Sequence, residues 1–235
     1  MTATTRARFI AMRVPLGGEV RVDFLGPMAL DGYGGRAYGG GEHRNCSLAN
    51  ILLEIVASTV DDCLAAESGG ADRIELCAAI ATGGLTPSLG TLVEARKQVR
   101  LPLMAVVRPR AGGFCYSDAE FAVMMRDAAF LLERGADGIV FGILHSDGRV
   151  DTKRCGKMLE LAGGRQTVFH RAFDVVPDPL RALDELIDLG FTRVLTSGQQ
   201  KTALEGSELI RGLGDRARGR IEVLPGAGVR AHNVE

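Results

Sequence analysis

The stretch Gly135-Ala-Asp-Gly-Ile-Val-Phe141 joins a glycine, a short polar turn and a run of apolar residues. The same order of residue types recurs at Gly70-Ala-Asp-Arg-Ile-Glu-Leu76 and at Gly190-Phe-Thr-Arg-Val-Leu-Thr196. A glycine in this position is typical of the end of a helix, and the apolar run after it is typical of a buried strand. The repeat therefore predicts units in which a helix is followed by a short loop and a strand.

On both sides of these stretches, strand patterns and helix patterns alternate along the chain. The predicted strands are Leu53–Ala57, Arg73–Cys77, Leu103–Val107, Gly138–Phe141, Thr167–His170, Arg193–Thr196 and Ile221–Leu224. The predicted helices are Thr59–Ser68, Ser88–Val99, Ser117–Arg134, Thr152–Ala162, Pro179–Leu189 and Ala203–Leu213. This alternation predicts an α/β fold with a parallel sheet, and its persistence favours a TIM-type (β/α)8 barrel. A doubly wound open sheet is the alternative, but no GxGxxG motif follows the first predicted strand.

After the seventh predicted strand, only residues 225 to 235 follow. We therefore expect a barrel that is truncated after its seventh strand and open between its first and seventh strands. An open parallel edge exposes unpaired backbone groups, which predicts low stability or association into a homo-oligomer.

The first fifty residues differ in composition from the rest. Residues 31–43 contain six glycines and show neither a helical nor a strand period. We therefore expect residues 1–50 to be a disordered or irregular extension and residues 51–235 to form the barrel domain, without its C-terminal portion.

Composition narrows the classes of partner. With 28 basic and 29 acidic residues, the net charge is -1, so no overall field favours nucleic acid. No apolar run approaches the roughly 18 residues that a membrane-spanning helix needs, so we expect no membrane partner. The 5 cysteines include no CxxC pair, a pattern that fits reduced thiols. We expect a cytoplasmic protein.

Acidic and basic side chains gather at the predicted carboxyl ends of the strands, which face one shared mouth in a barrel. Glu54 and Glu75 lie on the first two strands, and His170 and Asp174 lie at the end of the fifth. Because side chains alternate along a strand, His170 should point inward together with Val168. These four ionisable residues form a candidate acid/base set. The alternative for either glutamate is a buried ion pair with an arginine that holds strand register.

Other strand ends carry groups suited to an anion. Arg108 and Arg110 could clamp a carboxylate or phosphate, Ser197 follows the sixth strand, and Gly226 and Gly228 belong to a turn that could form a backbone nest. Together these residues predict an enzyme site for a small anionic or phosphorylated substrate.

Nine segments, in order, resemble the CutC family of copper homeostasis proteins. They are Leu53-Glu-Ile-Val56, Gly69-Gly-Ala-Asp-Arg-Ile-Glu-Leu-Cys77, Gly83-Gly-Leu-Thr-Pro-Ser88, Val107-Arg-Pro-Arg110, Phe114-Cys-Tyr-Ser-Asp118, Asp137-Gly-Ile-Val-Phe-Gly142, Phe169-His-Arg-Ala-Phe-Asp174, Arg193-Val-Leu-Thr-Ser-Gly198 and Pro225-Gly-Ala-Gly228. The resemblance implies a TIM barrel whose eighth strand would lie beyond the end of this chain, a cytoplasmic location, and a role in copper homeostasis with Cu(I) binding.

The resemblance also implies a metal ligand. Copper binding in some members is attributed to two cysteines on the first two strands; Cys77 matches the second position, and Val56 stands at the first. Cu(I) prefers soft ligands, so a single thiolate would need a methionine, a histidine or a second subunit beside it. The sequence thus leaves three interpretations open: a copper homeostasis protein with a copper ion at Cys77, an enzyme that acts on a small anion, and a truncated fragment without function.

Overall fold

The computed structural model describes residues 8–13, 51–230 and 233. Its elements, in chain order, are β1 (Arg8–Arg13), β2 (Ile51–Ala57), α1 (Val60–Ser68), β3 (Arg73–Leu76), η1 (Ile80–Thr82), α2 (Leu89–Gln98), β4 (Leu103–Val106), α3 (Asp118–Glu133), β5 (Gly138–Phe141), α4 (Thr152–Ala162), β6 (Gln166–Phe169), η2 (Arg171–Val175), α5 (Pro179–Leu189), β7 (Arg193–Thr196), α6 (Ser207–Ala217) and β8 (Glu222–Pro225). The elements η1 and η2 are short 3-10 helices.

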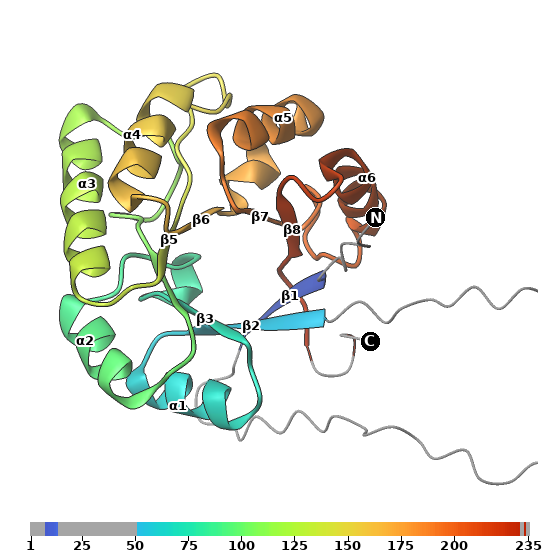
Figure 1. Cartoon of the computed structure of the whole chain (residues 1–235). Coiled ribbons are helices and arrows are strands. Elements are labelled where there is room, and N and C mark those ends of the chain that lie inside the picture. The colour runs from blue at the N-terminus through green and yellow to red at the C-terminus, as the bar shows by residue number, and fades with distance from the viewer. Residues whose placement is uncertain (1–7, 14–50, 231–232, 234–235) are drawn as a thin grey trace, which may run out of the picture.

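The strands form one parallel sheet in the order β1 to β8. In Figure 1 the sheet curls around a common centre, and helices α1 to α6 lie outside it. Strands β2 to β8 are the seven strands that the sequence predicts, each displaced by two residues or fewer at its ends. The predicted TIM-type α/β barrel is confirmed.

Strand β1 is an addition to the predicted architecture. It runs parallel to β2, with Ala11 opposite Glu54 and Arg13 opposite Val56. It lies between β2 and β8, at the edge that we expected to be open (Figure 1). Residues 8–13 thus depart from the expected irregular extension, because one isolated apolar run carries no periodic signal by which to recognise it. The expectation for residues 1–7 and 14–50 lies outside the described residues.

The repeated stretches have a specific role in joining the strands. The third residue of each stretch, Asp72, Asp137 or Thr192, accepts a hydrogen bond from a backbone N–H near the start of the neighbouring strand, at 2.7, 2.8 and 2.9 Å respectively. These bonds reach β2, β4 and β6. The repeat thereby fixes the register of successive parallel strands, which explains why it marks the fold.

One helix differs from its prediction. We expected a helix over Ala203–Leu213, whereas α6 begins at Ser207. The preceding residues are held in a turn, because Ala203 donates its N–H to the carbonyl of Ala227 at 2.9 Å and the Gly206 backbone packs tightly against Gly198. The start of the helix is therefore set by tertiary contacts and not by helix propensity.

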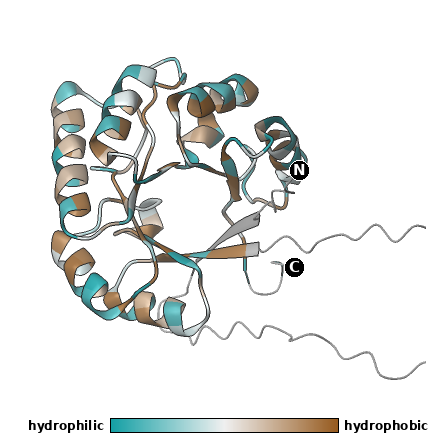
Figure 2. Ribbon diagram, in the orientation of Figure 1, coloured by the Kyte–Doolittle hydropathy of each residue, from teal (hydrophilic) through white to brown (hydrophobic). Residues whose placement is uncertain are grey.

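Two apolar layers form the core. The outer layer lies between the sheet and the helices, each of which carries both hydrophilic and hydrophobic residues (Figure 2). The inner layer fills the barrel and consists of buried side chains that alternate with the outer ones along the strands. Its buried members are Cys77, Met104, Val106, Val140, Val168, Leu195 and Leu224.

Candidate functional site

A cavity of about 550 Å³ opens where the strands end. Its walls come from β2 to β8 and the loops that follow these strands. Seven of the ten residues proposed from the sequence line it: Glu75, Cys77, Arg108, His170, Asp174, Gly226 and Gly228. The cavity lining does not include the other three, Glu54, Arg110 and Ser197.

Glu75 projects from β3 into the cavity and is buried. Its Oε2 has no hydrogen-bond partner among the described residues. Burial raises the pKa of this carboxyl to about 8; the charge of Glu54 adds to the rise and Arg73 opposes it. Glu75 is therefore mostly protonated at neutral pH, yet close enough to its pKa to give up the proton and take it back.

His170 follows β6 and points inward beside Val168, as the alternation predicted. Its Nδ1 accepts a hydrogen bond from the Ala172 N–H at 3.2 Å, so the neutral ring carries its proton on Nε2. Burial, together with the nearby Arg108 charge, lowers the pKa of His170 to about 3. His170 is thus a neutral donor, and its Nε2 has no partner within the described part of the chain.

The close packing of this imidazole depends on a glycine. A Cβ on Gly142 would lie 2.6 Å from Nδ1 of His170 and 2.9 Å from the Cβ of Ala172. Only a residue without a side chain leaves room for the ring in this position. The chain therefore fixes the orientation of His170 through both the hydrogen bond and the packing.

Arg108 supplies a buried positive charge to the cavity. Backbone carbonyls hold its guanidinium: those of Thr82 at 3.2 Å, Gly84 at 3.1 Å and Gly112 at 2.8 Å. Its Nε is buried and has no acceptor among the residues that the structure describes. Since neutral carbonyls orient the group without cancelling its charge, Arg108 can attract an anion.

An aromatic ring joins these groups. The guanidinium carbon of Arg108 lies 5.0 Å from the ring centre of Phe114, and that ring centre lies 4.9 Å from the ring centre of His170. Phe114 thus packs against both the cation and the imidazole. The sequence predicts no role for Phe114, because this residue lies in the loop between β4 and α3, where no strand alternation indicates the direction of a side chain.

Asp174 lines the cavity, but its carboxylate is already fully engaged. It accepts hydrogen bonds from the Ser197 N–H at 3.0 Å and the Ser197 hydroxyl at 3.0 Å, and it pairs with Arg171 Nε at 2.8 Å. Asp174 and Ser197 therefore tie the loop after β6 to the loop after β7. This role is positional, unlike the acid/base and anion-binding roles that we expected for them.

Glu54 and Arg110 also differ from expectation. Glu54 lies within β2, not at its end, and forms a buried ion pair with Arg73. Arg110 leaves the strand direction after β4 and binds Glu120 at the start of α3, together with the carbonyl of Gly113 at 2.9 Å. The structural alternative thus holds for Glu54, while Glu75 carries the unpaired carboxyl.

The loop after β8 forms the wall that contains Gly226 and Gly228. Gly226 donates its N–H to the Thr196 carbonyl at 2.9 Å, so this amide is not available to a ligand. Ala227 and Gly228 both have positive φ values, 75° and 74°. For Ala227 this conformation is strained, and such strain is found most often where a loop serves a site.

Cys77 is buried in the cavity wall, next to Gly84. Across the described ranges, no group of three or more His, Cys, Asp or Glu side chains is placed to hold a metal ion. Among the described residues, the ligand set that Cu(I) requires is therefore not assembled around Cys77.

A sequence model of the CutC family matches residues 51–235 of this chain. The chain belongs to the CutC family. A CutC family protein of Treponema denticola is 55% identical over 187 residues, which are 80% of this chain and 76% of that protein. The human protein named copper homeostasis protein cutC homolog is 46% identical over 185 residues, 79% of this chain and 68% of its own.

Solved structures agree. The CutC protein of Streptococcus agalactiae is 36% identical and has a TM-score of 0.75, over 78% of this chain and 90% of that chain. The aldolase QR15 is 14% identical with a TM-score of 0.54, over 75% of this chain and 79% of its own, and therefore shares the fold alone. The predicted family is confirmed, and the names of the relatives support copper homeostasis as the family's designation.

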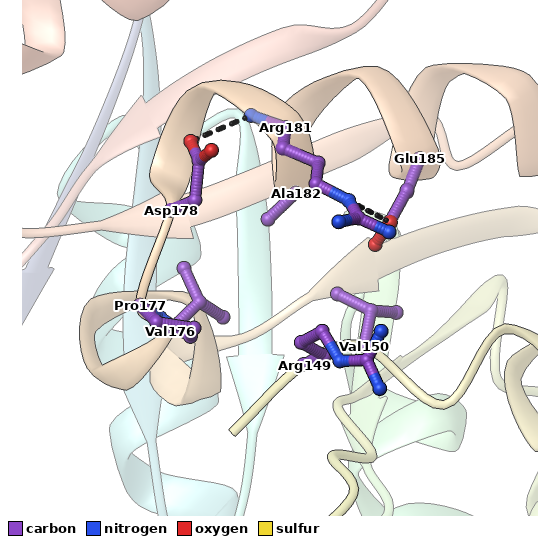
Figure 3. Close-up of a pocket in the computed structure, with 8 residues that line it drawn as sticks. All are labelled: Arg149, Val150, Val176, Pro177, Asp178, Arg181, Ala182 and Glu185. Atoms are coloured by element: carbon purple, nitrogen blue, oxygen red, sulfur yellow. Dashed lines mark hydrogen bonds and ion pairs between the residues drawn. The ribbon is translucent and has the colours of Figure 1, made fainter. Parts of the chain in front are cut away.

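A second, smaller cavity lies outside the CutC barrel mouth, between the segment before α4 and the start of α5 (Figure 3). It measures about 110 Å³. Its arginines already have partners: Arg181 pairs with Glu185 at 2.9 Å, and Arg149 pairs with Asp147 at 2.7 Å. We therefore place the candidate site of this CutC chain at the larger cavity.

No helix in the described part of the chain is long and apolar enough to cross a membrane.

Proposed function

We propose that this CutC chain binds a small 2-oxo acid in the large cavity and transfers a proton at the carbon next to its carbonyl group. One observation carries the proposal. Three residues that line a single cavity each carry a buried polar atom with no hydrogen-bond partner among the described residues: Glu75 Oε2, Arg108 Nε and His170 Nε2. Buried polar groups are normally hydrogen-bonded, so a cluster of three unpaired ones favours a site that a ligand completes.

Each of the three groups has a distinct part in this chemistry. Arg108 would hold the carboxylate of the ligand, because its charge meets no carboxylate in the described chain. His170, fixed as a neutral ring with its proton on Nε2, would donate to the carbonyl oxygen. Such a donor stabilises the negative charge that develops on this oxygen.

Glu75 would move the proton. In its ionised form it takes a proton from the carbon next to the carbonyl, and the electron pair of that C–H bond shifts to form an enolate. The enolate oxygen accepts the hydrogen bond from His170, and Glu75 then returns the proton. A pKa of about 8 suits this role, because both protonation states are populated near neutral pH.

Calorimetric titration with pyruvate tests the site. The wild-type protein should bind pyruvate, and Arg108→Gln should weaken binding by about tenfold to a hundredfold, the loss of one charged hydrogen-bonding group. Arg149→Gln removes an arginine of the smaller cavity and should leave the affinity unchanged. Arg108→Lys, which keeps the charge, should retain part of the affinity, and thermal unfolding should show that each variant is folded. Equal affinities for the wild type and folded Arg108→Gln would contradict the proposal, as would no binding to the wild type.

Copper homeostasis is the second candidate function. It is supported by the names of the relatives and by the position of Cys77 in the cavity wall. Among the described residues, no group of metal-ligating side chains surrounds Cys77, so copper binding there would need a further ligand such as a methionine, a histidine or a residue of a second copy. Competition with a Cu(I) chelator on the wild type and Cys77→Ser tests this: a matched, weak affinity in both would eliminate copper binding at Cys77.

We also propose a cytoplasmic location. No disulfide forms among the four cysteines that the structure describes, which are Cys63, Cys77, Cys115 and Cys155. Reduced thiols are characteristic of that compartment. Cell fractionation of an epitope-tagged chain would test the location, and recovery with an exported marker protein would contradict it.

A further inference from the structure

The loop after β8 lines the cavity and contains two backbone amides without an acceptor among the described residues. The carbonyl of Ala227 accepts from the Ala203 N–H at 2.9 Å, and the carbonyl of Gly228 accepts from the Asn233 side-chain amide at 3.0 Å. In a trans peptide the carbonyl and the N–H point in opposite directions. The N–H groups of Gly228 and Val229 are therefore turned away from these partners, and in the part of the chain described here neither finds an acceptor.

Glycine is necessary for this loop conformation. A Cβ on Gly228 would lie 2.8 Å from Cγ2 of Thr202, and its φ of 74° disfavours any side chain. Asn233 also accepts the Arg230 N–H at 2.7 Å, so it holds the turn from two points. Successive amides that turn toward one point form a concave donor surface for anions.

This amide surface lies across the cavity from Arg108. In the order of the eight strands, Arg108 follows β4 and the loop follows β8, so the two are four strands apart around the barrel. Glu75 on β3 and His170 after β6 lie on the walls between them. A ligand that touches both ends would therefore pass the proton-transferring group.

Positive charge is found at both ends of the cavity, near Arg108 and near the loop after β8. Three arginines line it: Arg108 at the buried end, and Arg171 and Arg230 toward the exposed end. Of the two acidic residues in the lining, Asp174 pairs with Arg171 at 2.8 Å, and Glu75 is mostly neutral below its raised pKa. Within the described ranges no carboxylate pairs with Arg108 or Arg230. The cavity therefore has an excess positive charge at each of two ends.

We infer that the ligand of this cavity is a short phosphate ester of a 2-oxo or 2-hydroxy acid, with its carboxylate at Arg108 and its phosphate on the Gly228 and Val229 amides beside Arg230. This inference rests on the proposed function, which it extends by a second anionic group on the substrate. A loop after the last strands of a TIM-type barrel is a frequent location for phosphate binding in this fold.

Calorimetry with three probes tests the inference. Glycerate carries only the carboxylate end, glycerol 3-phosphate only the phosphate end, and 3-phosphoglycerate both. We expect 3-phosphoglycerate to bind about tenfold to a hundredfold more tightly than glycerate, the gain from a second charged contact. Arg230→Gln and Gly228→Ala should each reduce this gain and leave glycerate binding unchanged. Arg108→Gln should weaken glycerate and 3-phosphoglycerate but not glycerol 3-phosphate.

The outcomes separate the two proposals. If glycerate binds in a manner that depends on Arg108 and 3-phosphoglycerate binds no more tightly, the phosphate site is refuted and the proposed function stands. Retention of the full gain in both Arg230→Gln and Gly228→Ala would also refute the phosphate site. If only glycerol 3-phosphate binds, the carboxylate end at Arg108 is refuted, and the proposed function falls with it.

Discussion

Replacement of Glu75 by glutamine should change how the stability of the protein depends on pH. Glu75 is buried in the cavity wall, and its pKa rises from the ordinary 4.5 to about 8. At about 1.4 kcal/mol for each pKa unit, this shift corresponds to about 5 kcal/mol of folding free energy that depends on the protonation of Glu75. The folded state holds the proton more tightly than the unfolded state, so the stabilisation is fully present below pH 4.5. It is lost as the pH rises through about 8.

Urea unfolding followed by circular dichroism at pH 5, 6, 7, 8 and 9 measures this effect. Glutamine has the shape of the neutral acid but cannot ionise, so Glu75→Gln should lack this loss of stability. The two proteins should be similar at pH 5, and the variant should be more stable by several kcal/mol at pH 9. Glu208→Gln, at an exposed glutamate of α6, controls for the loss of one acidic group.

The difference between Glu75→Gln and the wild type is the informative quantity, because contributions from other titrating groups cancel in it. A difference that stays constant from pH 5 to pH 9 would show that Glu75 ionises as easily in the folded as in the unfolded state. That result would refute the burial argument from which its acid/base role is derived.

Three further predictions concern packing, ion pairing and the sheet edge. Gly142→Ala should destabilise the protein by about 1–3 kcal/mol in thermal unfolding, because the added Cβ would clash with His170. The control is Gly156→Ala in α4, where the added Cβ meets no atom within 4 Å, and this substitution should be neutral or stabilising. Glu54→Ala should cost about 3–5 kcal/mol in urea unfolding, because it breaks a buried ion pair with Arg73. Glu94→Ala breaks only the exposed pair with Lys97 and should cost less than about 1 kcal/mol, and equal effects of the two substitutions would contradict the assignment. Deletion of residues 1–13 should uncover the edge of β2 and promote association, seen as a larger mass by light scattering, and an unchanged mass would contradict a covering role for β1.

Strand alternation predicted most of the barrel because its signal is local. The seven strands β2 to β8, the inward direction of His170 and the clustering of Glu75, Cys77 and Arg108 all follow from residue periods and from the geometry of parallel strands. The repeated polar residue before each strand also had a direct physical basis, as the hydrogen bond from Leu103 to Asp137 shows.

The errors lie where side-chain direction depends on tertiary contacts. Arg110 follows the end of β4, where alternation no longer applies, and Glu120 draws it away from the cavity. The sequence groups Glu54 with the residues at the strand ends, but it lies three residues before the end of β2, where its carboxylate pairs with Arg73. The role of Phe114 depends on a loop that no residue period describes.

Exchange of carbon-bound hydrogen for deuterium tests the central claim most directly. Pyruvate in D2O with the wild-type protein should take up deuterium at its methyl group, at a rate that rises with pH and levels off above about pH 8, where Glu75 is ionised. Folded Glu75→Gln should show no uptake above the rate without protein. Uptake that is equal in the wild type and in Glu75→Gln, or absent in a wild type that binds pyruvate, would contradict proton transfer by Glu75.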